Sequence, residues 1–331
     1  MCFSVVERPF GEITLNRIAR SALYYAGLLG AARWSRRQAL RILVYHRFDD
    51  YRDGVSKLES QCEHLRRHYS PLTLRQITES FERGERLPPN PIAVTVDDGH
   101  SDSVKTGFPI FQAYEIPVTL FVVSDAADKK LWLWFDQVSY LVQQTRRTTL
   151  EINGETLDLT RDRRRAANRV AEKMKQMPNR DRLLWLAELV VRLAVEIPAQ
   201  ASSEFALLDW NELRRLAKQG VEIGCHSKTH PILSRVESRA ELEDEISGAK
   251  LRMEQELGAN VLHFAYPNGT WKDFNGEIAS LVKASGFRCA VTAESGLNEA
   301  RGDAFSLRRL HAEPSFSKKR FAELLAGLRK Y

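Results

Sequence analysis

The sequence predicts an α/β protein whose parallel strands form a barrel or a doubly wound sheet. Short apolar runs alternate with segments of helical periodicity along most of the 331 residues. The clearest unit is a strand at 92–96, a helix at 106–114 and a strand at 118–123. This order makes a βαβ unit and implies that the strands are parallel. In such folds the active site lies at the carboxyl ends of the strands.

The elements of the first third of the chain follow from local signals. Residues 41–45 are an apolar run, which predicts a first buried strand. Residues 55–69 carry apolar side chains at helical spacing, and a second helix continues through Ile77 and Phe81. A cluster of prolines at 88–91 then forces a loop before the next strand.

The same alternation returns in the last third of the chain. A helix at 209–219 is closed by a glycine, and the strand at 221–224 follows it directly. Residues 238–257 read as one long helix rich in i,i+4 charge pairs, and Gly258 ends it. The remaining elements are expected as a strand, a helix and a strand at 261–266, 277–285 and 287–292.

Two segments do not follow this alternation of strands and helices. Residues 128–205 contain the hairpin turn Asn153-Gly154 and two charged helices between 161 and 195, so we expect a mainly helical insertion there. The rest of 41–331 is then one domain. Residues 1–40 are expected as an N-terminal segment with an amphipathic helix at 12–38, which either lies on a membrane surface or packs on the domain.

Composition places the chain among ordinary globular proteins and narrows its partners. Hydrophobic residues make up 43% and charged residues 28%, which argues against collagen, coiled coil and global disorder. The net charge of +6 suits an acidic polymer or an anionic membrane surface, or it reflects a solvated basic surface. The basic residues do not interleave with aromatic residues, so no nucleic-acid partner is expected.

The cysteines and the hydropathy pattern bear on the compartment. Cys2, Cys62, Cys225 and Cys289 show no CxxC spacing and are expected to be reduced, mostly buried thiols, which favours the cytoplasm. No stretch reaches the roughly 18–20 apolar residues that cross a bilayer, and no signal peptide is recognised. We therefore expect a protein that is cytoplasmic or peripheral to the membrane.

Two motifs place metal-type ligands at the ends of predicted strands. Asp97 and Asp98 end the strand at 92–96, and His226 and His230 follow the strand at 221–224. Two imidazoles and one carboxylate make an open zinc site, and the spare carboxylate can serve as a base. Adjacent carboxylates share one site only where the strand has ended, and Gly99 permits that turn. The alternatives are a simple turn at the aspartates, and a capped helix start with a surface histidine.

These motifs resemble those of the polysaccharide deacetylases, the NodB-homology family of carbohydrate esterases. Residues 95–99 (Thr-Val-Asp-Asp-Gly) resemble the family's first motif, and 226–230 (His-Ser-Lys-Thr-His) resemble its metal motif. Residues 264–269 (Phe-Ala-Tyr-Pro-Asn-Gly) occupy the place of the third motif. Residues 43–47 (Leu-Val-Tyr-His-Arg) resemble the start of exopolysaccharide-associated members. The resemblance covers residues 41 to about 315.

The resemblance implies a fold and a reaction. The fold would be an irregular (β/α) barrel of about seven strands, the (β/α)7-type NodB-homology fold. Asp97 would be the general base, and Asp98, His226 and His230 would bind zinc or another divalent transition metal. The metal would polarise the acetamide carbonyl and lower the pKa of bound water. An N-acetyl sugar would lose acetate, and the backbone N–H near Asn268, with the metal, would stabilise the oxyanion.

The sequence departs from the family pattern in the third motif. Ala265 stands where the family has an arginine that orients the base. The first candidate for the general acid is His311, and the second is His46. Alternatively, His311 is a surface residue and His46 is a core histidine. The expected substrate contacts are Tyr266, Pro267, Asn268, Trp134 and Asp136.

The leading hypothesis is a metal-dependent N-deacetylase acting on a bacterial polysaccharide or a lipid-linked saccharide. A deformylase or other deacylase of a lipid-linked sugar would use the same metal site. A non-catalytic glycan-binding protein on the same fold is the alternative from another class, since Ala265 departs from the family pattern. Metal content and acetate release distinguish these three.

Overall fold

The computed structural model describes residues 27–49, 53–129, 132–152, 154–299 and 302–328. The amphipathic helix expected at 12–38 therefore lies largely outside the described residues. Its described part contains α2 (Leu28–Ser35), which packs beside the last helix of the chain. No helix in the described ranges combines the length and the apolar character needed to cross a membrane.

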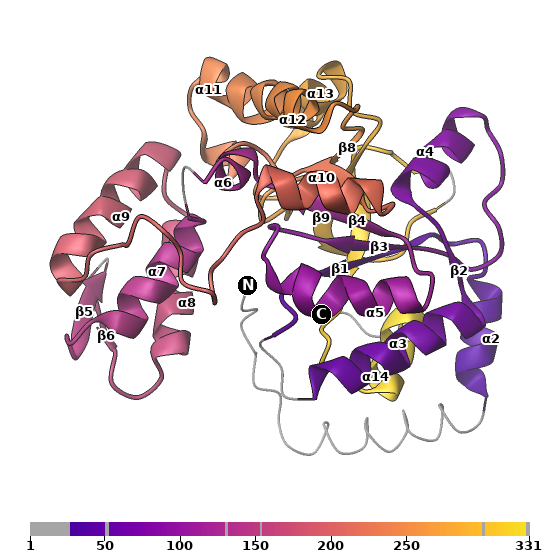
Figure 1. The fold of residues 1–331 in the computed structure, drawn as a ribbon, viewed down its shortest axis with the longest axis horizontal. Coiled ribbons are helices and arrows are strands. Elements are labelled where there is room, and N and C mark those ends of the chain that lie inside the picture. The colour runs from indigo at the N-terminus through magenta and orange to yellow at the C-terminus, as the bar shows by residue number, and fades with distance from the viewer. Residues whose placement is uncertain (1–26, 50–52, 130–131, 153, 300–301, 329–331) are drawn as a thin grey trace.

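Seven parallel strands close into a barrel at the centre of the molecule (Figure 1). The ring runs in the order β1-β10-β9-β8-β7-β4-β3 and closes where β3 pairs with β1. The (β/α)7-type barrel expected from the family resemblance is thereby confirmed. Its strands are β1 (Arg41–Tyr45), β3 (Pro91–Val96), β4 (Val118–Val122), β7 (Glu222–Cys225), β8 (His263–Ala265), β9 (Cys289–Ser295) and β10 (Leu307–His311).

The strands are short and apolar because both of their faces are covered. Every residue of β1 and of β3 is buried, as expected for parallel strands between a barrel interior and an outer helical layer. The two-residue strand β2 (Ser70–Pro71) pairs with the start of β3 and was not predicted. Gly224 in β7 allows close packing, because a Cβ atom there would lie 2.5 Å from the Phe121 ring.

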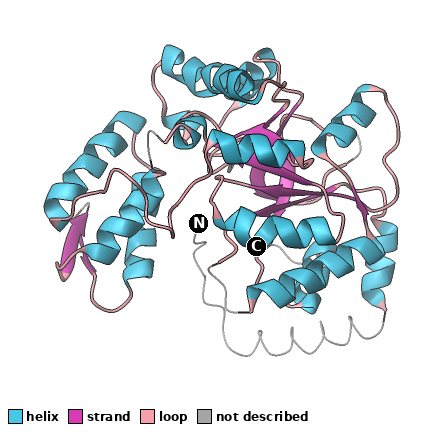
Figure 2. Cartoon of the chain, viewed as in Figure 1, coloured by secondary structure: helices cyan, strands magenta, loops and turns pink. Residues whose placement is uncertain are grey.

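Helices surround the barrel (Figure 2). Most match the predicted elements to within a few residues, and Asp209 caps its helix through a capping box as its position suggests. The helices outside the insertion, besides α2, are α3 (Gly54–His68), α4 (Leu74–Glu82), α5 (Phe108–Ala113), α6 (Ser124–Ala127), α10 (Trp210–Lys218), α11 (Arg239–Glu243), α12 (Ala249–Leu257), α13 (Gly276–Ala284) and α14 (Lys318–Leu325).

Two predicted helices contain irregular turns. The helix expected at 106–114 begins with a π turn, η1 (Ser103–Gly107), before α5. The long helix expected at 238–257 is divided by a second π turn, η3 (Asp244–Gly248), between α11 and α12. A 3-10 turn, η2 (Leu233–Arg235), lies before α11. Such π turns occur often at functional sites.

Most of the residues between α6 and α10 form a separate lobe, drawn at the left of Figure 1. It has its own apolar core, which includes Val138, Leu141 and Leu189. A hairpin is present around Gly154, whose φ of 74° is left-handed, and two helices follow it. Helix α7 was not predicted from the sequence. The lobe consists of α7 (Trp134–Gln144), β5 (Thr149–Ile152), β6 (Glu155–Asp158), α8 (Arg163–Met174) and α9 (Asn179–Leu193).

Candidate active site

Asp97 and Asp98 leave the end of β3 in different backbone conformations. The N–H of Asp97 still donates to the carbonyl oxygen of Tyr45 at 3.0 Å, in continuation of the strand. Asp98 and Gly99 then take left-handed φ values of 73° and 77°, a conformation that aspartate tolerates better than most residues. Both carboxylates thereby lie within 4 Å of His226 Nε2, at 3.9 Å and 3.6 Å respectively.

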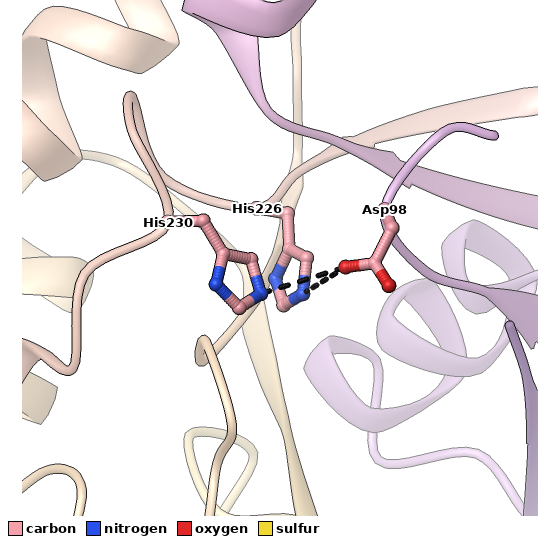
Figure 3. A group of neighbouring side chains, drawn as sticks. All are labelled: Asp98, His226 and His230. Carbon is pink, nitrogen blue, oxygen red and sulfur yellow. Dashed lines mark ion pairs between the residues drawn. The ribbon is translucent and has the colours of Figure 1, made fainter. Parts of the chain in front are cut away.

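His226 and His230 reach the same point from a loop that follows β7 (Figure 3). Asp98 Oδ1 lies 3.6 Å from His226 Nε2 and 3.4 Å from His230 Nε2. All three side chains are buried. The spacing of the two histidines is compatible with a helical turn or a folded loop, and the structure shows a loop. Ser227 and His230 within it have left-handed φ values of 63° and 60°.

This loop is fixed by a carboxylate that the sequence motifs do not reveal. Glu245, on the π turn η3, accepts hydrogen bonds from the backbone N–H groups of Lys228 at 3.0 Å and Thr229 at 2.9 Å. The N–H of His230 donates to Ser227 Oγ at 3.0 Å. These contacts hold a left-handed, strained loop in one conformation.

The ring of His226 is oriented by the third motif. Its Nδ1 lies 2.7 Å from the carbonyl oxygen of Ala265, and since a carbonyl can only accept, Nδ1 carries the proton. Nε2 therefore presents its lone pair toward Asp98. This arrangement is typical of a metal-binding histidine with a second partner. Ala265 thus contributes its backbone at the position where the family has an arginine side chain.

The three residues fit a tetrahedral metal ion. Ligand atoms around zinc, each at about 2.0–2.2 Å, lie roughly 3.3 Å apart in tetrahedral geometry, close to the spacings from Asp98 to both imidazoles. One atom from each of Asp98, His226 and His230 lies within 4.8 Å of the others. The contact with His230 and the charge of His46 hold the pKa of Asp98 well below its usual range although burial alone would raise it. The carboxylate is thus ready to bind a cation.

Arg309 on β10 is the partner of the second carboxylate. Its Nη1 and Nη2 donate to the two carboxylate oxygens of Asp97, each at 2.7 Å. Arg309 and Asp97 are both 1% exposed. Burial alone would raise the pKa of Asp97, but the guanidinium and then His226 lower it below the usual range. Sequence reasoning missed this residue; its one signal is its position two residues before His311 and so on the same face of the strand.

The two candidate acids differ in access to the site. His46 is 23% exposed at its side chain, its Nε2 is 3.9 Å from Asp97 Oδ2, and it lines the pocket described below. His311 is 8% exposed, and its Nε2 lies 2.9 Å from the carbonyl oxygen of Ala293. Burial lowers the pKa of both rings, that of His46 to about 4. Asp102 anchors the loop that carries His46 by accepting from the Phe48 N–H at 2.9 Å.

The substrate contacts expected from the third motif are placed differently by the structure. Tyr266 is 1% exposed, stacks on Phe274 with ring centroids 4.0 Å apart, and donates from its hydroxyl to the Phe305 carbonyl at 3.0 Å. It is a core residue, which corrects that expectation, and Pro267 is buried beside it. Asn268 does reach the pocket, with a left-handed φ of 59°.

A pocket of about 300 Å³ extends from the metal-type ligands to the inserted lobe. Its barrel wall includes His46, Asp98 and His230, and its lobe wall is formed by α7 and α8. Polar side chains of the lobe that line it include Asp136, Ser139, Gln143, Arg164, Asn168, Glu172 and Lys175. A volume of this size is at the lower end of the range for small-molecule sites.

The first turn of α7 contacts the ligand residues directly. Trp134 Nε1 donates to the carbonyl oxygen of His230 at 3.1 Å, and the Phe135 ring meets the His230 ring edge-on with centroids 5.2 Å apart. Asp136 forms a buried ion pair with His100 at 2.8 Å. Burial lowers the pKa of His100, but Asp136 outweighs it and raises the pKa above its usual value. Trp134 and Asp136 are expected to contact substrate, and both line the pocket. They also support the site, Trp134 through the His230 carbonyl and Asp136 through His100.

Comparisons with known proteins agree with this geometry. A family model described as polysaccharide deacetylase matches residues 84–183 and 186–290. The deacetylase PplD of Streptococcus pyogenes, solved in complex with acetate, superposes with a TM-score of 0.58 at 15% identity, covering 87% of this chain and 98% of that chain. No curated protein sequence matches the chain.

Two further solved structures share the fold at similar distance. IcaB from Ammonifex degensii has a TM-score of 0.55 and 17% identity, with 87% of this chain and 97% of that chain covered. A de-N-acetylase from Aggregatibacter actinomycetemcomitans has a TM-score of 0.55 and 15% identity, with 86% and 99% covered. At these identities the structural matches establish the fold, and the family follows from the sequence model.

Proposed function

We propose that this chain is a metal-dependent deacetylase that removes N-acetyl groups from the amino sugars of a bacterial polysaccharide or lipid-linked saccharide. The chain belongs to the polysaccharide deacetylase family. Family membership makes it a hydrolytic deacetylase acting on acetylated polysaccharide, which sets aside the non-catalytic alternative. The observation that carries the proposal is the pairing of a buried Asp97–Arg309 couple with three metal-type ligands at one end of a pocket.

The residues that would hold the ion are Asp98, His226 and His230, and their nitrogen and oxygen donors suit zinc. When bound, zinc would supply Lewis-acid activation of water and of the acetamide carbonyl. Because the chain would supply three ligands, a fourth position would remain for water or substrate. The buried, hydrogen-bonded loop around His226 and His230 fixes that geometry before substrate arrives.

Asp97 would accept the proton of the attacking water. Its carboxylate stays ionised in a buried place because Arg309 donates to both of its oxygens. Asp97 Oδ2 also lies 3.9 Å from His226 Nε2, so a water beside the ligand cluster is within reach of the base. The lowered pKa of Asp97 keeps it in the accepting form across the neutral range.

His46 is better placed than His311 to protonate the departing amine. His46 lines the pocket beside Asp97 and Asp98, whereas one ring nitrogen of His311 already bonds to a backbone carbonyl. The two aspartates raise the pKa of His46 against the effect of burial, and a proton taken up by Asp97 can pass to this side of the site. The Asn268 backbone N–H would assist by donating to the developing oxyanion.

The sugar that carries the acetamide would enter from the pocket between barrel and lobe. The polar residues of α7 and α8 would meet the parts of the saccharide next to the reacting residue. Two structural relatives, one solved in complex with acetate and one a de-N-acetylase, support N-acetyl as the acyl group. A formyl group on a lipid-linked sugar would need the same machinery and is kept as the second candidate.

The test measures acetate and formate release from a panel of N-acylated glycans, with added zinc and with chelator. The key variant is Asp97→Asn, and Asp162→Asn is the control because Asn also caps a helix and Asp162 caps α8 away from the ligands. Zinc-dependent acetate release that is lost in Asp97→Asn and kept in Asp162→Asn supports the proposal. Formate release would instead support the second candidate function, removal of a formyl group from a lipid-linked sugar. Full activity of Asp97→Asn contradicts it.

A further inference from the structure

A second pocket, of about 450 Å³, lies between α2, α3 and α14. It lies near the end of the barrel where the strands begin, because it is lined by Tyr69, which precedes β2, and by Ala326. Arg36 donates to that Ala326 carbonyl. The ligand residues of the active site lie at the opposite, carboxyl ends of the strands. Nothing in the deacetylase reaction uses this pocket.

Five of the eleven described residues that line the pocket have basic side chains. Arg33, Arg67 and Lys318 contribute three cations, and His64 and His68 add two imidazoles. The histidines lie one helical turn apart on α3, with ring centroids 4.7 Å apart. None of the lining residues is acidic. The described ranges contain no ion pair of Arg33 or Arg67, and Lys318 is paired only with Glu63, which is 54% exposed.

His64 is the buried polar group of the pocket. It is 7% exposed, and within the described residues its ring makes no hydrogen bond. It packs against the rings of His68, Tyr69 and Phe321. Burial first, and then the charges of His68, Arg33 and Lys318, lower its pKa to about 3. The ring of His64 therefore has an N–H group that is available to donate to a ligand in the pocket.

We propose that this pocket binds a phosphate group, carried either by a free anion or by a lipid headgroup. Phosphate offers several acceptor oxygens and at least one negative charge, which match the forked guanidiniums and the imidazole N–H of His64. A metal ion would also find two histidines at i,i+4 spacing, but three neighbouring cations repel it. A carboxylate would leave most of the five basic groups unmatched.

The two sources of phosphate make different predictions for the full-length protein. Inorganic pyrophosphate is titrated calorimetrically, and vesicles of phosphatidylglycerol are compared with vesicles of phosphatidylcholine by co-sedimentation. Heat of binding with pyrophosphate alone indicates a soluble phosphate ligand. Sedimentation with phosphatidylglycerol vesicles alone indicates a headgroup. In either case binding should weaken as salt is raised.

The variants are Arg67→Glu, Lys318→Glu and His64→Gln, and the matched control is Arg66→Glu. Arg66 neighbours Arg67 on α3, but it pairs with Glu115 and does not line the pocket. Each pocket variant should weaken binding by about tenfold, with the control within about twofold and deacetylase activity unchanged in all. An equal loss in control and pocket variants overturns the proposal, as does the absence of binding to both probes.

Discussion

Replacing Arg309 by methionine removes both hydrogen bonds to Asp97 while it keeps an apolar stem in the core. The two groups are buried and joined by two contacts of 2.7 Å, so Asp97 is left without its counter-ion. Removing one partner of a buried ion pair costs about 3–5 kcal/mol of unfolding free energy. Coulomb's law gives a similar scale, about 4 kcal/mol for unit charges 4 Å apart at an effective dielectric constant of 20.

The sign of the pH dependence follows from the direction of the pKa shift. In the natural protein the folded-state pKa of Asp97 is depressed, so the pair stabilises the fold above the unfolded pKa of about 3.9. That contribution is lost as pH falls through the lower folded value. Without Arg309, burial raises the pKa of Asp97, and the charged carboxylate destabilises the fold at neutral pH. The stability gap should therefore be largest near pH 7 and shrink below pH 4.

The assay is urea unfolding of chelator-treated protein at pH 7 and at pH 3.5. Arg308→Met is the control, since Arg308 is the exposed neighbour on the same strand. In zinc-loaded enzyme the acidic limb of the kcat/KM profile should move to higher pH in Arg309→Met, and Arg309→Lys should fall between, because an ammonium cannot form the fork. A destabilisation that is equal at both pH values, or an unmoved acidic limb, would refute the reasoning.

Three further predictions concern the site and its support. His46→Gln should lower kcat by about 10²–10⁴-fold, and His311→Gln should lower kcat less. Equal losses in the two variants would contradict the assignment of His46 as the general acid. Trp134→Phe removes the donor to the His230 carbonyl and should weaken zinc binding by about tenfold, as read by competition with a chelating dye. Gly224→Ala places a methyl group against the Phe121 ring and should cost about 1–3 kcal/mol in urea unfolding.

The sequence was sufficient to predict the ligand cluster because of strand topology. Parallel strands present their carboxyl ends at one edge, so residues after β3 and after β7 had to meet there. Asp98, His226 and His230 do meet, and Figure 3 shows them converging from two separate segments. The sequence predicts a turn at Gly99, and the structure shows left-handed φ values at Gly99 and also at Asp98.

The supporting residues could not be predicted, because they depend on how distant elements pack. Arg309 reaches Asp97 only because β10 pairs with β1 and closes the barrel. Glu245 reaches the histidine loop only because a π turn interrupts a helix that otherwise reads as regular. Ala265 acts through its carbonyl oxygen, which any residue would offer, so no side-chain pattern marks it. Each case is a contact across the fold, and local periodicity carries no information about it.

The left-handed backbone conformations in the site make thermal stability and catalytic activity conflicting requirements. Four of the nine non-glycine residues with positive φ in the described chain are Asp98, Ser227, His230 and Asn268. A left-handed conformation costs roughly 1–2 kcal/mol for most residues and is relieved by glycine. Glycine at these positions would therefore ease the backbone while it deletes ligands and loop contacts. A library screened for melting temperature alone would accumulate such glycines and return proteins that survive heating without turning over substrate.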